Sequence, residues 1–440
     1  MQSELFGSLG EIKWMSRTKG TRQEFEHRDI NVRDRKLIVF ELGYTGHYPN
    51  YIQHLAKYWC EQELPGRLDI VVSPKFVQHH ADVVDIASTY NQKSLNFVAI
   101  TLDEEASLIP RKSSINRALR SFQEWNLLRK YATTLGATQC LLLYFDSFQA
   151  AVASGAKLPC LFSGIYFRPT FHYSDFTHYV PSLKDSLQQW REKYIILPRV
   201  LRHPQLQNLF CLDPFVIKHI KQFASKAKVV HLPDPVLICS FSEQELEKFK
   251  QSLKIDPSRK VFLLFGALYD GRKGIHQLLE AISKLSPILC QKLCLLLVGQ
   301  IGGTDKSPIQ TRISEISQSL PVQIIVRDEF VPEQEVPMYF QIADVILAPY
   351  QRHVGMSGTL VEAAAAQKPL LSSDYGLLGA ITRHWQLGLT VASTVPSEIT
   401  KGLTRFLLES PEGFGDRNKM KAFAEQNSAE RFANVIFQCL

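Results

Sequence analysis

Short apolar runs alternate with longer amphipathic segments along most of the chain. Runs of about four to eight apolar residues between turn residues predict buried strands, and apolar positions spaced three and four apart predict helices. In the first half, the strands are expected at 36–42, 69–74, 95–102, 140–145, 159–167, within 209–223, and at 229–236. Helices are expected from about Asn50, at 113–136 and at 148–155. Such an alternation is typical of parallel sheets covered by helices.

The second half repeats this alternation after a helix at 242–253. Its strands are expected at 260–268, 293–300, 322–330, 344–350 and 370–374, with helices between them. The fold class is therefore α/β, with two Rossmann-like domains whose parallel sheets face each other across a cleft. We expect a polar extension at 1–35, a first domain at 36–236 and a second at 237–440, whose last helix can pack back on the first domain. Pro233 and Pro235 stiffen the expected linker.

Composition narrows the class of protein. The 440 residues are 45% hydrophobic and 21% charged, which is typical of a soluble globular chain. No apolar run approaches the roughly 20 residues that cross a bilayer, and the polar N-terminus lacks a signal peptide, so a cytoplasmic location is expected. The eight cysteines form no Cys-x-x-Cys pair, which favours buried thiols. A net charge of +7 suits nucleotide phosphates or an acidic membrane surface. No nucleic-acid motif is present.

The stretch from 353 to 379 carries the most distinctive chemistry. Gly355 and Gly358 allow the backbone to approach a ligand closely. Thr359 stands three residues before Glu362, which is the spacing of a capping box at a helix start. The free amides of such a start attract anions, so we expect a nucleotide diphosphate here. The alternative is an ordinary helix start in which Glu362 only caps.

Four segments, taken in order, resemble the GT-B glycosyltransferases, and more narrowly the retaining family-4 type. They are FLLFGALYDGRKGIHQLLEAI at 262–282, LLLVGQ at 295–300, VPMYFQIADVILAPY at 336–350 and VGMSGTLVEAAAAQKPLLSSD at 354–374. The first domain is similar to the family mainly in its layout and its first glycine loop. The resemblance implies that the second domain binds a nucleotide-sugar donor and the first binds the acceptor.

The resemblance also implies roles for single residues on the donor side. Arg272 and Lys273 of the GRKG loop would pair with the diphosphate, and Glu362 would accept hydrogen bonds from the ribose hydroxyls. Where the family commonly has a second glutamate, this chain has Val354, so backbone amides at 355–357 or His353 would have to contact the sugar. The complete set expected on the donor side is Gly46, Gly266, Arg272, Lys273, Gly299, His353, Gly355, Met356, Ser357, Gly358, Thr359 and Glu362.

Four residues of the first domain are candidates: His47 and Asp146 for catalysis, and Arg168 and His172 for the acceptor side. His47 follows the first glycine loop, and we expect it to contact substrate. Asp146 ends a buried strand and would orient the acceptor hydroxyl and take its proton. The alternative for Asp146 is an N-cap of the helix that begins near Phe148. Arg168 and His172 lie in the loop RPTFHY, where an arginine would clamp phosphate or pair with a surface acid.

The preferred function is transfer of a sugar from a nucleotide diphosphate sugar to a hydroxyl acceptor, with retention as the resemblance implies. His47, Asp146, Arg272 and Lys273 are the candidate catalytic residues. No metal site and no obligatory cofactor is expected. The competing hypothesis is a non-catalytic scaffold that binds nucleotide or glycan. Separately, the basic amphipathic segment 111–132 predicts either peripheral contact with an anionic membrane, on its inner face, or ordinary packing on its own sheet.

Overall fold

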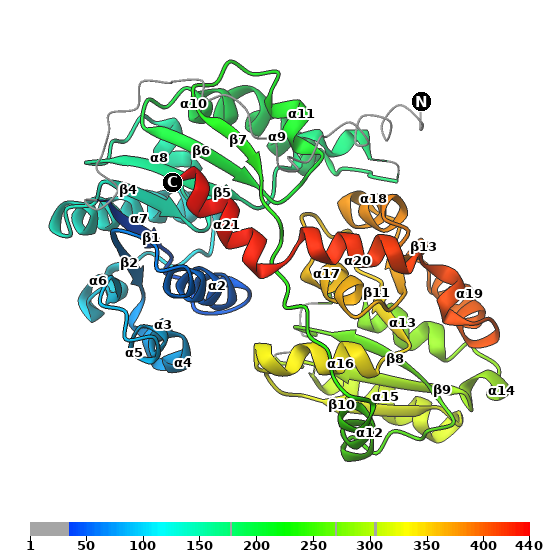
Figure 1. Cartoon of the computed structure of the whole chain (residues 1–440). Helices are drawn as coiled ribbons and strands as arrows, with labels where there is room; N and C mark the ends of the chain where they lie inside the picture. Colours follow the sequence, from blue (N-terminus) through cyan, green and yellow to red (C-terminus); the bar gives the residue numbers. More distant parts are fainter. Residues whose placement is uncertain (1–34, 177, 269–270, 303–305) are drawn as a thin grey trace.

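The structure is a computed structural model that describes residues 35–176, 178–268, 271–302 and 306–440. The predicted extension at 1–35 therefore lies outside the described residues, except for Arg35. Figure 1 shows two α/β halves with extended chain between them.

The first half contains a sheet of seven parallel strands in the order β3-β2-β1-β4-β5-β6-β7. At its centre, Ile38 lies opposite Asp69 on one neighbouring strand and Cys140 on the other. The strands are almost continuously apolar because helices cover both faces of the sheet. Their bounds are β1 (Lys36–Phe40), β2 (Arg67–Val72), β3 (Leu95–Ala99), β4 (Gln139–Leu142), β5 (Leu161–Tyr166), β6 (Leu206–Cys211) and β7 (Lys228–His231).

Alternate side chains of β1 enter different cores. Leu37 and Val39 pack on the face that α2 covers, while Ile38 and Phe40 pack with Trp125 of α7 on the other face. The helical elements of this half are α2 (Tyr48–Glu61), α3 (Pro74–His79), α4 (Ala81–Val84), α5 (Ile86–Thr89), α6 (Leu102–Ser107), α7 (Ser114–Thr134), η2 (Phe145–Ser147), α8 (Gln149–Ala153), η3 (Thr170–Asp175), α9 (Leu183–Arg191), η4 (Glu192–Ile196), α10 (Leu197–Leu201) and α11 (Val216–Ile220).

The second half contains six parallel strands in the order β10-β9-β8-β11-β12-β13. These are β8 (Lys260–Phe265), β9 (Leu293–Val298), β10 (Gln323–Arg327), β11 (Val345–Ala348), β12 (Leu370–Ser373) and β13 (Gly388–Val391). The helical elements are α12 (Glu243–Ser252), α13 (Ile275–Ile282), α14 (Pro287–Cys290), α15 (Lys306–Ser319), η6 (Glu333–Glu335), α16 (Val336–Ile342), α17 (Gly358–Ala365), α18 (Gly376–His384), α19 (Pro396–Leu408), η7 (Pro411–Phe414), α20 (Arg417–Gln426) and α21 (Ala429–Cys439). Two parallel sheets flanked by helices confirm the predicted α/β class with two Rossmann-like halves.

The C-terminal helix α21 lies against the first half, as Figure 1 shows in red. Phe432 and Ile436 belong to the same core as Trp59 of α2. The carbonyl of Cys439 accepts a hydrogen bond from Asn208 Nδ2 at 3.0 Å. The chain therefore crosses between the halves twice, and the two crossings meet where Val236 forms a bridge with Ser428.

The loop expected at RPTFHY is partly helical in the structure. Arg168 and Pro169 precede the 3-10 helix η3, which includes the buried Phe171, His172 and Tyr173. The expectation of a loop was wrong for these residues because their side chains pack among aromatic rings of other elements, such as Phe223 against Phe171 and Tyr375 against the neighbouring Tyr179.

Candidate functional site

Lys273 is buried at the centre of the candidate donor side. It lies in the loop between β8 and α13, and its Nζ donates a hydrogen bond to Tyr350 Oη. The same Nζ lies 3.4 Å from Thr359 Oγ1 and 4.3 Å from the centroid of the Tyr350 ring. Lys273 thus connects three elements of the second half: its own loop, the end of β11 and the start of α17.

Tyr350 is the partner that sequence reasoning missed. Burial alone would raise the pKa of its phenol, but the Lys273 ammonium and hydrogen bonds from neighbouring side chains hold that pKa below its usual value. Its hydroxyl shares a 2.7 Å hydrogen bond with Thr359 Oγ1 and accepts one from Ser357 Oγ. The only signal in the sequence was its position at the end of the run DVILAPY.

The predicted capping box from Thr359 to Glu362 is wrong. The helix α17 begins at Gly358, so Thr359 is already helical, and its hydroxyl is engaged with Tyr350. The N-cap is Ser357, and within the described residues its side chain makes no capping hydrogen bond. The positive end of α17 therefore lies open to an anionic group at the glycine turn.

The glycine turn meets the first half directly. Gly355 has a φ of +95°, and its amide donates a 2.8 Å hydrogen bond to Tyr173 Oη in η3. A Cβ at Gly355 would lie 3.2 Å from Arg168 Cγ, which is tighter than ordinary contact. Only glycine combines this backbone angle with this approach. Met356 packs partly buried against the cores of both halves.

Arg272 and His353 form a second contact on the donor side. Arg272 Nη1 donates to His353 Nδ1 at 3.4 Å, and the other ring nitrogen lies 3.4 Å from the Met356 carbonyl. Burial, followed by the charge of Arg272, lowers the pKa of His353 to about 3. His353 is therefore neutral at physiological pH, and leaves the positive charge here to Arg272 and Lys273.

Gly266 directly follows β8 and Gly299 directly follows β9. Their φ angles are +111° and +126°. A Cβ on Gly299 would lie 2.0 Å from the Gly266 carbonyl oxygen, and a Cβ on Gly266 would lie 2.9 Å from Lys273 Nζ. Both glycines thus allow close packing beneath Lys273.

His47 stands opposite, at the end of the first glycine loop. Its ring stacks on Phe167 with centroids 4.9 Å apart and lies 5.2 Å from Tyr51. Desolvation, together with the charges of Arg168 and Arg272, lowers the pKa of His47 to about 4. Because these arginines come from different halves, both halves contribute charge at this point. Gly46 beside it has a φ of +73° and open space around it.

The carboxylate of Asp146 accepts hydrogen bonds from two backbone amides. Its Oδ2 accepts from the Phe167 amide at 2.8 Å and its Oδ1 from the Arg168 amide at 3.0 Å. Burial raises the pKa of Asp146 to about 6, although these two bonds and the Arg168 charge oppose the rise. The alternative of an N-cap is wrong, because α8 begins at Gln149 with Phe148 as its N-cap. Asp146 therefore positions the loop that carries Arg168.

Arg168 and His172, the two residues expected on the acceptor side, lie in different environments. Arg168 is exposed, and its Nη2 donates to Tyr144 Oη. His172 is buried inside the first half, where its Nε2 lies 2.9 Å from Asp213 Oδ2 and its ring stacks on His219. The structure therefore brings Arg168 to the site and leaves His172 in the core.

Glu362 lies on α17 between the halves, near two carboxyls that sequence reasoning did not select. Burial, together with the charges of Glu333 and Asp234, raises the pKa of Glu362 to about 8. Asp234 accepts a hydrogen bond from Tyr51 Oη, and Glu333 lies 3.0 Å from His54 Nε2. The free protein therefore holds Glu362 largely protonated near neutral pH.

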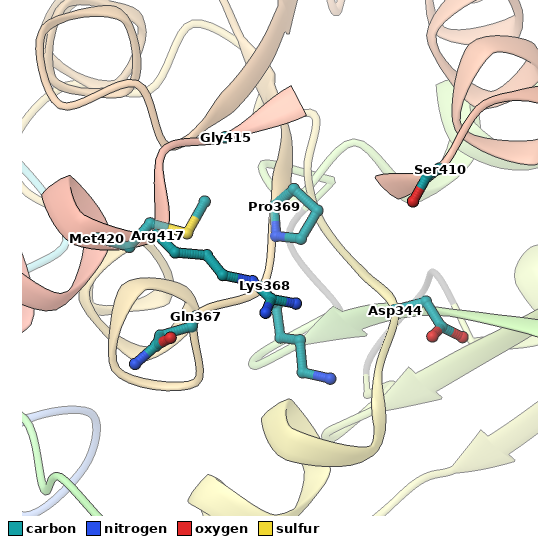
Figure 2. A pocket seen from close by; sticks show the side chains of 8 residues that line it. All are labelled: Asp344, Gln367, Lys368, Pro369, Ser410, Gly415, Arg417 and Met420. Carbon is teal, nitrogen blue, oxygen red and sulfur yellow. The ribbon is translucent and has the colours of Figure 1, made fainter. Parts of the chain in front are cut away.

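A separate hollow of about 170 Å³ lies on the far side of the second half. Figure 2 shows Lys368 and Arg417 in it, beside Pro369 and Asp344. Asp344 and Pro369 immediately precede β11 and β12, so this hollow is at the amino ends of those strands. Ligands of such folds bind at the carboxyl ends, and we do not assign the donor to it.

Neither a metal centre nor a membrane-spanning helix is found among the described residues. In those ranges, no group of three or more His, Cys, Asp or Glu side chains is placed to hold a metal ion. Among the same residues, no helix combines the length and apolarity that crossing a membrane requires.

The chain was compared with known families and proteins. Residues 245–427 match the family of glycosyl transferases group 1. YtcC of Bacillus subtilis (strain 168), which carries the name of a glycosyltransferase, is 28% identical over 150 residues. That match covers 33% of this chain and 36% of YtcC, so it spans about a third of the relative's length.

Solved structures resemble the chain over nearly its whole length. A glycosyltransferase from Rickettsia africae ESF-5 has a TM-score of 0.61 at 13% identity, covering 92% of this chain and 97% of its own. Anabaena HepE in complex with UDP-glucose has a TM-score of 0.63 at 12% identity, covering 92% and 98%. WaaG, a glycosyltransferase involved in lipopolysaccharide biosynthesis, has a TM-score of 0.58 at 14% identity, covering 91% and 98%. These likenesses concern the fold.

Proposed function

Because the chain has a GT-B fold whose second half belongs to the glycosyl transferases group 1 family, we propose that it transfers a sugar from a nucleotide diphosphate sugar to a hydroxyl acceptor. We propose further that the anomeric configuration is retained. The second half would hold the donor and the first half the acceptor. Anabaena HepE, whose fold is similar, was solved with UDP-glucose, which makes UDP-sugars the first donors to test.

One observation carries this proposal: cationic groups and an uncapped helix start converge on the glycine turn at 355–358. Lys273 reaches the start of α17 through Tyr350 and Thr359. Arg272 contacts His353 beside the turn, and Arg168 approaches Gly355 from the other half. Such an arrangement suits a diphosphate, which carries its charge on several oxygens at once.

In the proposed reaction, the main role of the protein is to supply positive charge to the leaving diphosphate. Cleavage of the bond between sugar and diphosphate leaves an oxocarbenium-like sugar and places negative charge on the leaving oxygen. Arg272, Lys273 and the first amides of α17 would stabilise that charge as it develops. Because Tyr350 and Thr359 hold Lys273 in place, little reorganisation would be required during the reaction.

The acceptor would approach from the first half, between His47 and Arg168. Neutral His47, with a pKa of about 4, can accept a hydrogen bond from an acceptor hydroxyl near pH 7. Asp146 uses both carboxylate oxygens on backbone amides. We therefore propose that Asp146 orients Arg168, and that the proton of the acceptor leaves with the diphosphate or through His47.

The experiment is a screen for nucleotide release. Purified protein is incubated with UDP-, GDP- and ADP-sugars in turn, and liberated nucleoside diphosphate is measured. Slow release from one donor supports transfer and identifies that donor. Nucleotide binding without release, also in the presence of a panel of glycan and lipid acceptors, would instead favour the scaffold function, for which Val354 is the supporting observation. Val354 offers no carboxylate to the sugar and packs against the core of its own half.

Glu362 predicts a pH dependence of nucleotide binding. Its carboxyl must be ionised to accept hydrogen bonds from both ribose hydroxyls, and its pKa in the free protein is about 8. We expect nucleotide affinity to rise as pH increases from 6 to 9. Glu362→Gln should bind about tenfold more weakly at pH 9, in line with the loss of a charged hydrogen bond, and show little pH dependence. Titration calorimetry at several pH values measures both.

The same pKa predicts an effect on stability with the opposite trend. Because the folded pKa of Glu362 is raised, its contribution to stability is complete below the unfolded value near 4.5 and is lost as pH rises through about 8. Glu362→Gln should lose less stability over that range than the wild type. Glu425→Gln, an exposed change on α20, serves as the control. A wild-type nucleotide affinity independent of pH would contradict the assignment of Glu362.

A further inference from the structure

The helix α9 presents an apolar stripe to solvent. Val180, Leu183, Leu187, Trp190 and Tyr194 are between 53% and 92% exposed. The last four are spaced four, three and four residues apart, which places them on one face of continuous helix through α9 and η4. None of the nine residues of α9 is buried. The stripe therefore serves no core of this chain among the described residues.

Basic side chains flank this stripe. Between residues 180 and 202, one of the two acids, Glu192, is buried against Tyr166 and Thr170. The other, Asp185, caps the helix through Ser182. The basic side chains on the same continuous helix, all exposed or half-buried, are Lys184, Arg191 and Lys193. The surface beside the apolar stripe therefore carries positive charge.

Two of the exposed apolar side chains are amphipathic aromatics. Trp190 and Tyr194 lie with ring centroids 6.0 Å apart, and Lys193 Nζ stands 5.6 Å from the Tyr194 ring. Trp and Tyr are favoured where one end of a side chain is apolar and the other meets water, as at the boundary of a bilayer.

We propose that α9 and its flanking residues dock on an anionic lipid bilayer. Charge complementarity favours this occupant: the basic border attracts anionic headgroups, whereas in a second copy the same border would meet like charge. Contiguous exposed apolar patches are uncommon on monomeric proteins and mark interaction sites. The bilayer would cover Leu187 and Trp190.

The proposed docking surface lies on α9, whereas the sequence pattern indicated the segment 111–132. In α7, Trp125 and Leu128 are buried in the core of the first half, and an exposed stripe of Ile115, Leu119 and Phe122 remains. Half of the predicted amphipathic face therefore packs on the sheet. The longer stripe is on α9.

The docking surface stands beside the candidate site. Tyr179, just before α9, packs on Tyr375 of the second half with ring centroids 5.3 Å apart. The preceding η3 holds Gly355 through Tyr173. A docked bilayer would lie close to the junction of the two halves. Docking itself does not depend on sugar transfer, so the two proposals can fail separately.

The test is flotation of the full chain with vesicles of phosphatidylcholine mixed with phosphatidylglycerol, beside vesicles of phosphatidylcholine alone. We expect binding to the mixed vesicles that is at least about tenfold stronger and weakens with salt, since each basic side chain contributes roughly fivefold near an anionic surface. The double variant Leu187→Ser with Trp190→Ser should lose binding. Ile288→Ser, which removes an equally exposed side chain in the second half, should retain it.

A second variant tests the charges. Lys184→Gln with Arg191→Gln should weaken binding to mixed vesicles roughly 25-fold and reduce its dependence on salt. No binding of the wild type to mixed vesicles would overturn the proposal. Loss of binding in Leu119→Ser with Phe122→Ser, but not in the α9 variants, would assign docking to α7 instead. Light scattering that shows a wild-type dimer dissociated by the α9 variant, without vesicle binding, would assign the stripe to self-association.

Discussion

Replacing Lys273 by alanine is expected to reduce nucleotide release from the donor by about 10²- to 10³-fold, the usual effect of removing one group that stabilises developing charge. The ammonium is buried and reaches both Tyr350 and Thr359. Alanine would remove the ammonium that connects the GRKG loop to the start of α17. The decrease should appear mainly in kcat, because charge on the leaving diphosphate grows during the reaction.

A structural role alone would give a different result. If Lys273 only stabilised the fold, Lys273→Ala would lower the melting temperature while the remaining folded protein kept its turnover. Thermal unfolding therefore accompanies the kinetics. Lys284→Ala is the matched control, since that lysine lies exposed on the same half and pairs with Glu280 in a surface contact. Equal turnover of the two variants would contradict the role assigned to Lys273.

Gly274→Ala is expected to have the second large effect, on both stability and donor binding. Gly274 is the N-cap of α13 and has a φ of +75°, and a Cβ there would lie 2.1 Å from the Pro349 carbonyl oxygen. That oxygen belongs to backbone, so the loop carrying Arg272 and Lys273 must move. We expect a loss of about 3 kcal/mol or more in the free energy of unfolding, and nucleotide binding at least tenfold weaker.

The variant Gly271→Ala is the control for Gly274→Ala, because it introduces an unfavourable backbone angle without a steric clash. Gly271 lies in the same loop with a φ of +64°, but a Cβ there meets no heavy atom within 4 Å. Its cost should be the left-handed conformation alone, about 1 kcal/mol. Chemical denaturation and calorimetry of the two variants measure the difference. Similar losses in both would show that the contact with Pro349 does not hold the loop.

The sequence predicted the architecture because its signal was local. Runs such as CLLLYF and LCLLLVGQ are apolar at successive positions, which only strands covered on both faces require. The expected strands at 260–268 and 293–300 extended past Gly266 and Gly299, whereas β8 and β9 end just before these glycines. The order of strands in each sheet, and the return of α21 to the first half, came from contacts between distant segments.

The site was less predictable. Thr359 had the spacing of a capping residue, but Tyr350 engages its hydroxyl nine residues away. Asp146 had the position of a cap or a base, but the amides of Phe167 and Arg168 occupy its oxygens. His172 had the appearance of a loop residue, but Asp213 holds it in the core.

The sequence by itself determined the two parallel sheets, and it indicated the glycine turn at 355–358 as the stretch in which we propose that a donor is held. These follow from hydrophobic periodicity and from glycine spacing, which act over a few residues. Only the tertiary structure decided that Lys273 is buried against Tyr350, that Arg168 reaches Gly355 from the other half, and that Glu362 lies near two other carboxyls. A hydrogen bond or a pKa depends on which groups meet, and those groups lie far apart along the chain.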